Sequence, residues 1–383
     1  MPDAMSVAEI VTPRPTPPAG RKFPCPSCGA RLDFDPAVRG LKCPFCGYQQ
    51  AIRKGVAGDV LEREIDDYLG REEAHGKAIP GRETQTRCPG CGAVVLLEKK
   101  VATERCPFCA TALENEPESA AGMIPPESLL PFEVDLRAAR DGFAKWLHGL
   151  WFAPGELRTV ARLGQLTGVY LPYWTYDAHT VTFYDGERGE DYYTTESYTT
   201  RNAQGETRTE TRQVRHTRWY PVSGDVAHFF DDVLVQASKS VPGDLLAGAS
   251  PWPLNKLEPF RPDYLSGFRA ERYAVGLKEG LANAKRVMQP TIDNLVRRDI
   301  GGDHQRVHEQ KTRYSAVTFK PLLLPLWVAV YRYHDKTYQV LVNGQTGKVT
   351  GYRPYSWAKI VRLILLVTAV IGVIVWLVLW LRK

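Results

Sequence analysis

Apolar residues are concentrated near the C-terminal end of the chain, where residues 363–381 form a run without a single charge. As a helix rising ~1.5 Å per residue, this run would be about 28 Å long, close to the ~30 Å hydrocarbon core of a bilayer. Aromatic residues flank both ends, as in the interfacial belts of membrane helices. They are Tyr352, Tyr355 and Trp357 on the near side and Trp376 and Trp380 on the far side. The pattern predicts one transmembrane anchor within residues 357–383.

The charges that flank this anchor do not decide its orientation, so we infer the orientation from the cellular compartment that suits the rest of the chain. Two basic residues precede the run and two follow it, so the positive-inside rule is silent here. The N-terminal segment, from Met1 to Gly20, is proline-rich and lacks the apolar stretch of a signal peptide, and abundant cysteines favour a reducing compartment. We therefore expect a single-pass, tail-anchored protein with the bulk of the chain in the cytoplasm.

Between residues 129 and 356 the pattern alternates between helical and strand-like periods. Residues 134–152 and 269–298 predict helices, the second bent or broken near Pro290. Residues 169–176 read as an aromatic strand, and residues 192–219 as a hairpin that turns at 202–205. Three further strands, at 326–333, 337–342 and 348–352, predict a meander. The expected fold class is α+β with mainly antiparallel sheet.

The N-terminal third divides into smaller pieces. Leu32 and Phe34 alternate with polar neighbours, as do Val95 and Leu97, so short strands are expected there. A charged segment between them spaces its apolar residues like one face of a short helix. The predicted domains are a flexible arm (1–22), zinc ribbon 1 (23–50), a linker with a short helix (51–86), zinc ribbon 2 (87–112), a second linker (113–128), the α+β domain (129–356) and the transmembrane anchor (357–383).

The composition of the 383 residues is that of an ordinary globular protein, with 44% apolar and 24% charged residues and a net charge of +6. Such values exclude a mainly disordered or polytopic chain. The small positive excess does not by itself indicate a nucleic-acid-binding protein.

The eight cysteines form four Cys-x-x-Cys pairs, and the second two pairs repeat the first two at a constant offset, from Cys25 to Cys88 and from Cys46 to Cys109. Fourteen residues separate the pairs within each unit. Two facing knuckles of this kind complete a tetrahedral site of four thiolates, which suits a structural zinc ion because no position is left open for water. The sequence predicts two Zn²⁺ ions and no catalytic metal. Their ligands are Cys25, Cys28, Cys43 and Cys46 in one unit and Cys88, Cys91, Cys106 and Cys109 in the other.

Other uses of these cysteines are less consistent with the sequence. Disulfides would require an exported chain, and a thioredoxin-type pair would require a βαβ setting that the pattern lacks. A rubredoxin-like iron site uses the same four thiolates, so spacing alone leaves iron as an alternative to zinc.

Charge bears on what the ribbons bind. Residues 1–112 contain 16 Lys/Arg and 14 Asp/Glu, and two zinc–tetrathiolate centres would bring the region to a net −2. A phosphate-binding surface should be distinctly basic, so protein partners are favoured over nucleic acid, which stays possible.

A search for catalytic residues finds none that we would assign. Gly344–Lys348 lacks the Gly-x₄-Gly-Lys-Ser/Thr spacing of a phosphate loop and reads as a turn. Asp231 and Asp232 should point apart on a strand, and His304 and His308 should share a helix face as a surface pair. We expect neither an enzyme nor a small-molecule substrate.

Several segments carry a family resemblance: the tandem Cys-Pro-x-Cys ribbons, GVYLPYWTYDAHT (168–180), FFDDVLVQASKSVP (229–242), YLSGFRAERYAV (264–275), DIGGDHQRV (299–307) and VLVNGQTGKVTGYRPYS (340–356). With the terminal span, the chain resembles a bacterial family of membrane-anchored, TFIIB-type zinc-ribbon proteins. Members of this family are often labelled primosomal protein N′ (replication factor Y) or superfamily II helicase-like. The resemblance implies a place at the bacterial inner membrane, in the company of SPFH-type and membrane-stress proteins.

Two functions are therefore expected. The first is a non-catalytic adaptor that recruits protein partners to the membrane. The alternative is a nucleic-acid-associated factor, linked to replication or transcription and tethered to the membrane.

Overall fold

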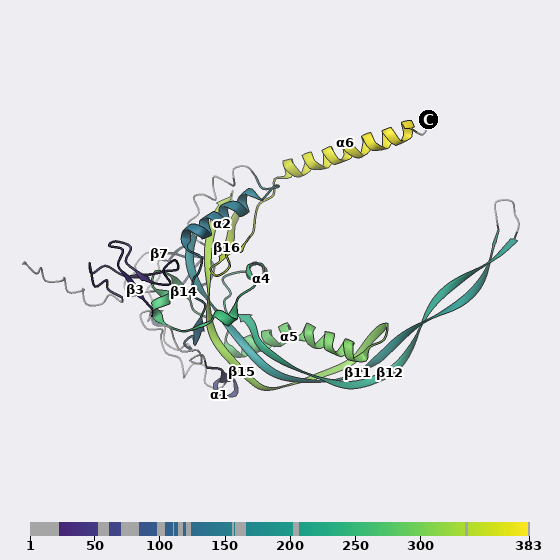
Figure 1. The fold of residues 1–383 in the computed structure, drawn as a ribbon, viewed down its shortest axis with the longest axis horizontal. Helices are drawn as coiled ribbons and strands as arrows, with labels where there is room; N and C mark the ends of the chain where they lie inside the picture. Colours follow the sequence, from purple (N-terminus) through teal and green to yellow (C-terminus); the bar gives the residue numbers. More distant parts are fainter. Residues whose placement is uncertain are drawn as a thin grey trace, which may run out of the picture.

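The computed structural model has an α+β fold dominated by antiparallel sheet, as the sequence predicts (Figure 1). The predicted arm at residues 1–22 and much of both linkers lie outside the described residues. The structure describes residues 23–52, 61–69, 84–97, 104–109, 111–113, 118–119, 124–154, 157, 166–201, 207–333 and 336–381.

Three very long strands form the backbone of the molecule: β11 (Leu166–Arg201), β12 (Thr207–Gln236) and β15 (His304–Tyr333). Strand β11 lies in the middle and pairs antiparallel with both of the others. The burial pattern of β11 changes along its length, from almost continuous burial to alternation and then to a stretch without a buried residue. The first part is therefore covered on both faces, the middle on one face, and the last part on neither.

The end of β11 and the start of β12 form a two-stranded projection, residues 190–201 and 207–218. We call this projection the arm; it is separate from the predicted flexible arm at residues 1–22. Pairing of β11 with β15 ends at Gly189 and His304, whereas pairing with β12 continues to Arg201 and Thr207. At ~3.3 Å per residue, the arm extends about 40 Å beyond the three-stranded sheet. In Figure 1 it is the teal ribbon that reaches away from the body. The predicted hairpin strands at 192–219 are thus present as the end of a much longer hairpin, and the predicted turn at 202–205 lies outside the described residues.

Helix α5 (Leu277–Ile300) lies along the concave face of this sheet. Its buried residues recur every three or four positions, from Leu277 to Ile300, so one apolar stripe faces the sheet. The side chains of Trp174 and Tyr176 donate hydrogen bonds of 2.9 Å to the carbonyls of Val275 and Leu277, which fixes the start of the helix on β11.

The observed second helix differs from the predicted one at its start. It begins at Leu277 rather than at 269, because Arg269–Glu271 forms strand β14 against β11. It also continues unbroken through Pro290. Pro290 lies on the exposed side of the helix, where water can satisfy the carbonyl that the proline leaves unpaired.

The predicted meander is confirmed: β15 pairs antiparallel with β16 (Lys336–Asn343), which pairs with β17 (Val349–Gly351). Residues 334–335 of its first turn lie outside the described residues. Helix α2 (Leu136–His148) is shorter than the predicted 134–152, because Asp135 accepts a hydrogen bond of 2.7 Å from the Ala138 N–H and so caps its first turn.

The smaller elements surround this framework. They are β1 (Asp33–Asp35), β2 (Gly40–Lys42), β3 (Gln49–Ala51), β4 (Arg63–Glu64), α1 (Asp66–Leu69), β5 (Thr84–Arg87), β6 (Val94–Leu97), β7 (Glu104–Arg105), β8 (Ala112–Leu113), β9 (Glu118–Ser119), β10 (Ser128–Leu129), α4 (Gly243–Ala249), η1 (Leu254–Lys256), β13 (Glu258–Pro259) and η2 (Pro262–Leu265).

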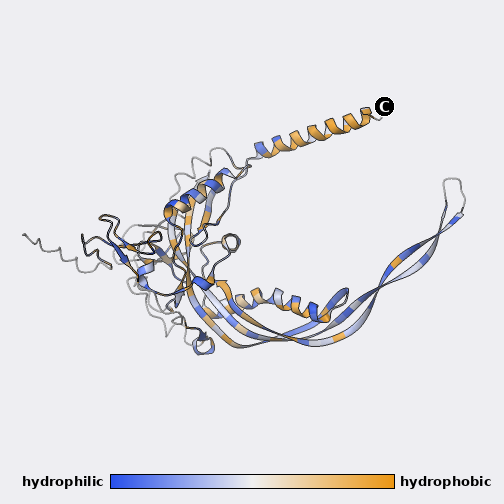
Figure 2. Ribbon diagram, viewed as in Figure 1, coloured by the Kyte–Doolittle hydropathy of each residue, from blue (hydrophilic) through white to orange (hydrophobic). Residues whose placement is uncertain are grey.

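Helix α6 (Trp357–Leu381) projects from the body and buries none of its residues. Figure 2 shows it hydrophobic along almost its whole length. It is long and apolar enough to cross a membrane and is the one such helix among the described residues. The N–H of Ser356 donates to the Phe152 carbonyl at 2.7 Å, and the Lys359 ammonium donates to the Ala153 carbonyl at 2.7 Å. These bonds tie the base of α6 to the loop after α2.

Candidate metal centres

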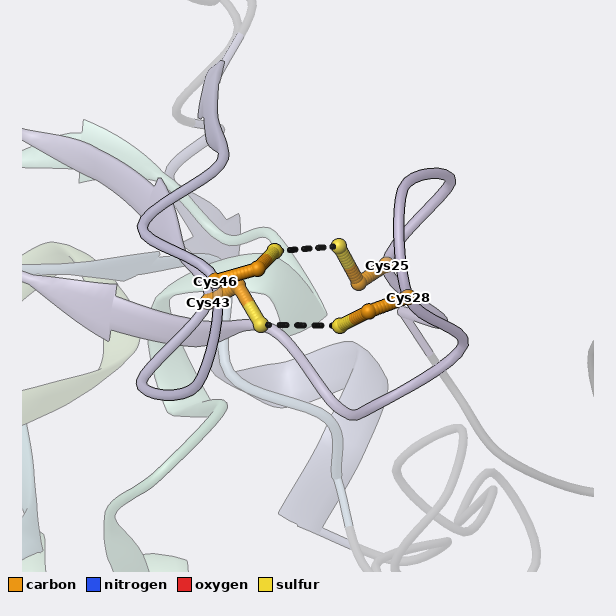
Figure 3. Close-up of side chains that lie close together, drawn as sticks. All are labelled: Cys25, Cys28, Cys43 and Cys46. Carbon is orange, nitrogen blue, oxygen red and sulfur yellow. Dashed lines mark hydrogen bonds between the residues drawn. The ribbon is translucent and has the colours of Figure 1, made fainter.

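The first cysteine unit, residues 23–52, brings together the four cysteines that the sequence predicts (Figure 3). Two knuckles face each other, and the sulfur atoms of Cys25 and Cys46 lie 3.5 Å apart, as do those of Cys28 and Cys43. One cysteine of each knuckle is buried and the other is exposed. The three-stranded sheet of β1, β2 and β3 holds the second knuckle against the first.

Glycines in a left-handed conformation shape three of the four knuckles. Gly29, Gly47 and Gly92 each have φ between 73° and 76°, a left-handed conformation that other residues rarely adopt. This turn lets the Gly29 N–H donate to the Cys25 carbonyl at 2.9 Å, so that both thiols of the pair project to one side.

The second unit, residues 84–113, repeats this geometry. Cys88 and Cys109 have their sulfur atoms 3.4 Å apart, and Cys91 and Cys106 have theirs 3.6 Å apart. A hydrogen bond between the Cys91 and Cys106 thiols lowers the pKa of Cys91 and, together with burial, raises the pKa of Cys106. A metal ion bound there would take the thiolates as its ligands, so its binding would release protons.

The spacing of the sulfurs fits a tetrahedral metal site and does not fit disulfides. A tetrahedron with metal–sulfur bonds of ~2.3 Å has edges of about 3.8 Å, close to the 3.4–3.6 Å seen between sulfur atoms. A disulfide would need ~2.0 Å, and all eight cysteines are free. Each unit can hold one metal ion with four protein ligands. Such a closed centre stabilises a fold and has no position for a reacting water.

Each unit is attached to the body in its own way. The Phe34 ring of the first unit packs on Tyr264 and Phe268, with ring centroids 5.3 and 6.2 Å apart. In the second unit, β6 pairs with β14, which joins that unit to the large sheet. A metal ion in either unit would therefore also support the packing of the body.

The acidic pair Asp231 and Asp232, which the sequence predicts to point apart, is part of a cluster of carboxylates in the structure. Asp231 and Asp232 should diverge on a regular strand, but a bulge in the β11–β12 pairing and a φ of 51° at Asp232 bring their carboxylates together with that of Asp177. The prediction that they point apart is wrong for this reason. The Lys320 ammonium lies 2.7 Å from Asp232 and so already supplies the cluster with a cation.

The two histidines do not lie on a helix. His304 and His308 are on strand β15, where an even spacing still places them on one face. His304 contacts Asp191 at 3.1 Å and His308 contacts Glu187 at 3.7 Å, so both have carboxylate neighbours on β11. The loop at Gly344–Lys348 is a turn, as predicted: Asn343 accepts from the N–H groups of Gln345 and Thr346.

A buried carboxylate that the sequence did not reveal lies at the end of β14. Burial raises the pKa of Glu271 to about 7, against the effect of hydrogen bonds that it accepts from the hydroxyls of Ser240 and Ser238. These two bonds fasten the segment after β12 to β14, which is a structural use of the group.

The base of α6 also gathers residues that are distant in the sequence. Trp151 is 77% exposed, as is Trp357, and the hydrogen bond between Ser356 and Phe152 brings the two segments together. The sequence gives no signal that Trp151 lies near Trp357, because the hydrogen bond that brings them together joins segments that are far apart along the chain.

Comparison with known proteins finds a relative over most of the chain. The chain is similar to YdjG, an uncharacterized protein of Bacillus subtilis strain 168, with 25% identity over 352 residues. This match covers 88% of this chain and 91% of the relative. No family model matches the chain, and no solved structure matches it. The similarity therefore extends over most of the chain, and the relative's name assigns no activity.

Proposed function

We propose that this protein is a non-catalytic adaptor of the bacterial inner membrane. Helix α6 anchors it, and two structural zinc ions hold the cysteine units as zinc ribbons. The ribbons, the α+β domain and the arm then face the cytoplasm and bind protein partners, in assemblies of the membrane-stress or SPFH type.

The observation that carries this proposal is the arm. It projects about 40 Å as a bare two-stranded ribbon, although such a ribbon is only marginally stable in water unless another surface supports it. Its tyrosines Tyr193 and Tyr198 are 63% and 39% exposed. Exposed tyrosines suit a protein-binding surface, because they bury a large area at low cost in conformational entropy.

The charges of the arm favour a protein partner over nucleic acid. Arg212 lies 3.2 Å from Glu196, and Arg215 lies 3.5 Å from Asp191, so carboxylates of the opposite strand neutralise these arginines. A surface for phosphate would leave such cations unpaired. The acidic cluster and the histidines described above likewise have partners of their own within the body, which supports a role without catalysis.

Site-specific photocrosslinking in intact cells tests the proposal. A benzoylphenylalanine residue replaces Tyr193 or Tyr198 on the arm, or Val287 on the exposed side of α5 as the control. We expect a discrete protein adduct from the arm positions that the control position does not give. Adducts to nucleic acid, or the same adducts from all three positions, would contradict the adaptor function.

A binding assay discriminates the alternative. Sub-micromolar affinity of the full chain for DNA or RNA near physiological ionic strength would favour a tethered nucleic-acid factor instead, if it is abolished by neutralising Lys42, Lys99, Lys100 and Arg105. The salt concentration matters because counterion release lets modest basic patches bind at low salt.

A further inference from the structure

An open hollow of about 720 Å³ lies beside the base of α6. One wall is the start of β16, with Lys336 and Tyr338. The other wall is the segment that joins β17 to α6, with Tyr352, Arg353 and Tyr355. The Tyr352 N–H donates to the Gln339 carbonyl at 3.0 Å, so the two walls are held together by backbone pairing.

The charges on these walls have one sign. Lys336 and Arg353 are the charged side chains that the described residues contribute to the lining, and within that part of the chain neither forms an ion pair. The Arg353 guanidinium instead lies over the Tyr355 ring, 5.3 Å from its centroid. The nearby carboxylate of Asp244 accepts a hydrogen bond of 2.7 Å from the Tyr352 hydroxyl and stays outside the lining. The hollow therefore suits an anion.

The position of the hollow selects the kind of anion. Arg353 and Tyr355 lie only two to four residues before Trp357, where α6 begins. The helix rises about 9 Å from Trp357 to the start of the uncharged run at Leu363. Headgroups occupy roughly the 5–8 Å outside the hydrocarbon core on each side. Once α6 spans a bilayer with Leu363 at the edge of the hydrocarbon core, the hollow opens just outside the headgroup layer and faces the lipid phosphates.

Further contacts hold the hollow at this level. Ser356 and Lys359 are hydrogen-bonded to the loop at residues 151–153, so the base of α6 is fixed to the body. Trp151, Tyr355 and Trp357 are all more than half exposed around this base. Exposed tryptophan and tyrosine rings partition to the membrane interface, and here they gather at the base of α6.

We propose that this hollow binds the phosphate headgroup of an anionic phospholipid, with Lys336 and Arg353 as its cationic ligands and Tyr338 and Tyr355 as neighbouring hydroxyl donors. The inference rests on the membrane anchorage proposed above, and it is independent of any protein partner. A lipid bound there would fix the rotation of the body about α6, because one contact point on the membrane is added to the helix itself.

The test uses the full chain in an uncharged detergent, titrated with short-chain phosphatidylglycerol or phosphatidylcholine and followed by calorimetry. We expect one phosphatidylglycerol to bind and phosphatidylcholine to bind at least tenfold more weakly. The double variant Lys336→Gln/Arg353→Gln should weaken phosphatidylglycerol binding about thirty-fold, given the ~1 kcal/mol that each cation near anionic lipid contributes. Both residues are at the surface, so the variant should fold normally.

The matched control is Arg208→Gln/Lys311→Gln, which removes the same charge from exposed positions on β12 and β15. It should bind phosphatidylglycerol like the unmodified protein. Equal binding of the two lipids, an unaffected double variant or an equal loss in the control would each overturn the site. Displacement of the lipid by equimolar glycerol phosphate would show a site for soluble phosphate and overturn the lipid assignment. Because no protein partner is present, failure here is distinguishable from failure of the adaptor function.

Discussion

Replacing Lys320 with methionine should destabilise the sheet where bulges interrupt the pairing of β11 with β12 and β15. The Lys320 side chain is only 9% exposed, and its ammonium lies 2.7 Å from Asp232 and 3.1 Å from Glu62. Asp177, which is 3% exposed, accepts from the Asp232 N–H at 2.6 Å and from the Thr318 hydroxyl at 3.0 Å. Methionine keeps most of the volume but leaves these carboxylates without their cation.

The expected loss is about 3 kcal/mol in the free energy of unfolding. Breaking a buried ion pair by removing one partner costs roughly 3–5 kcal/mol, and the lower end applies because Asp232 is 30% exposed and Glu62 is 48% exposed. The loss should shrink as the pH falls from 8 to 5. Burial already raises the pKa of Asp177, and losing Lys320 raises it further, so that protonation removes the uncompensated charge at the lower pH.

Urea unfolding of the full chain in nonionic detergent, followed by near-ultraviolet circular dichroism, measures this loss at both pH values. Lys311→Met, at an exposed position of the same strand, is the matched control and should cost less than about 0.5 kcal/mol. Adding Asp232→Asn to Lys320→Met should recover part of the stability. A loss as small as that of the control, or one that is equal at pH 5 and pH 8, would refute the reasoning.

Three further outcomes are expected. Elemental analysis of the full chain should find two zinc ions, and the Cys43→Ser variant should lose one of them while the second unit keeps its own. Iron, or a single metal ion in the intact protein, would contradict this prediction. Deletion of residues 357–383 should move the protein from the membrane fraction to the soluble fraction, and continued sedimentation with membranes would argue against α6 as the anchor. Burial of the Glu271 carboxylate should lower the free energy of unfolding by roughly 3 kcal/mol above pH 7, and Glu271→Gln should remove this loss. The folded pKa of about 7 exceeds the ordinary value of 4.5, so the loss fades as the pH falls from 7 to 4.5. Urea unfolding at pH 8.5 and pH 4 measures the difference, which should be large only at the higher pH.

The sequence was a reliable guide wherever a short, local pattern determines the structure. The cysteine pairs, the glycines after them, the apolar run of α6 and the turn at Gly344–Lys348 each depend on residues within a few positions of one another. These features lie in the structure where the pattern predicts them.

The long sheet could not be predicted in the same way. In β11 the burial goes from continuous to alternating to absent, because β15, β12 and α5 cover different lengths of it. A periodicity argument detects only the parts with a constant pattern, so it found 169–176 and 192–219 as separate elements. The cluster of Asp177, Asp231 and Asp232 depends on a bulge, which is a property of how two strands pair rather than of either sequence.

The order in which the chain leaves the ribosome has a consequence for the central strand. Strands β11 and β12 are joined by a short connection and can pair early in synthesis. Leu166 of β11 also pairs with Ala329 of β15, and this pairing can form only after Ala329 has been synthesised, much later. Contacts of such high sequence separation form slowly, because the loop must close before they contribute any stability. Until β15 has been synthesised, the aromatic stretch from Val169 to Tyr176 therefore presents one unpaired edge to solvent. Folding chaperones should recognise the nascent chain during this interval, and α6 emerges only after the partner of that edge has been made.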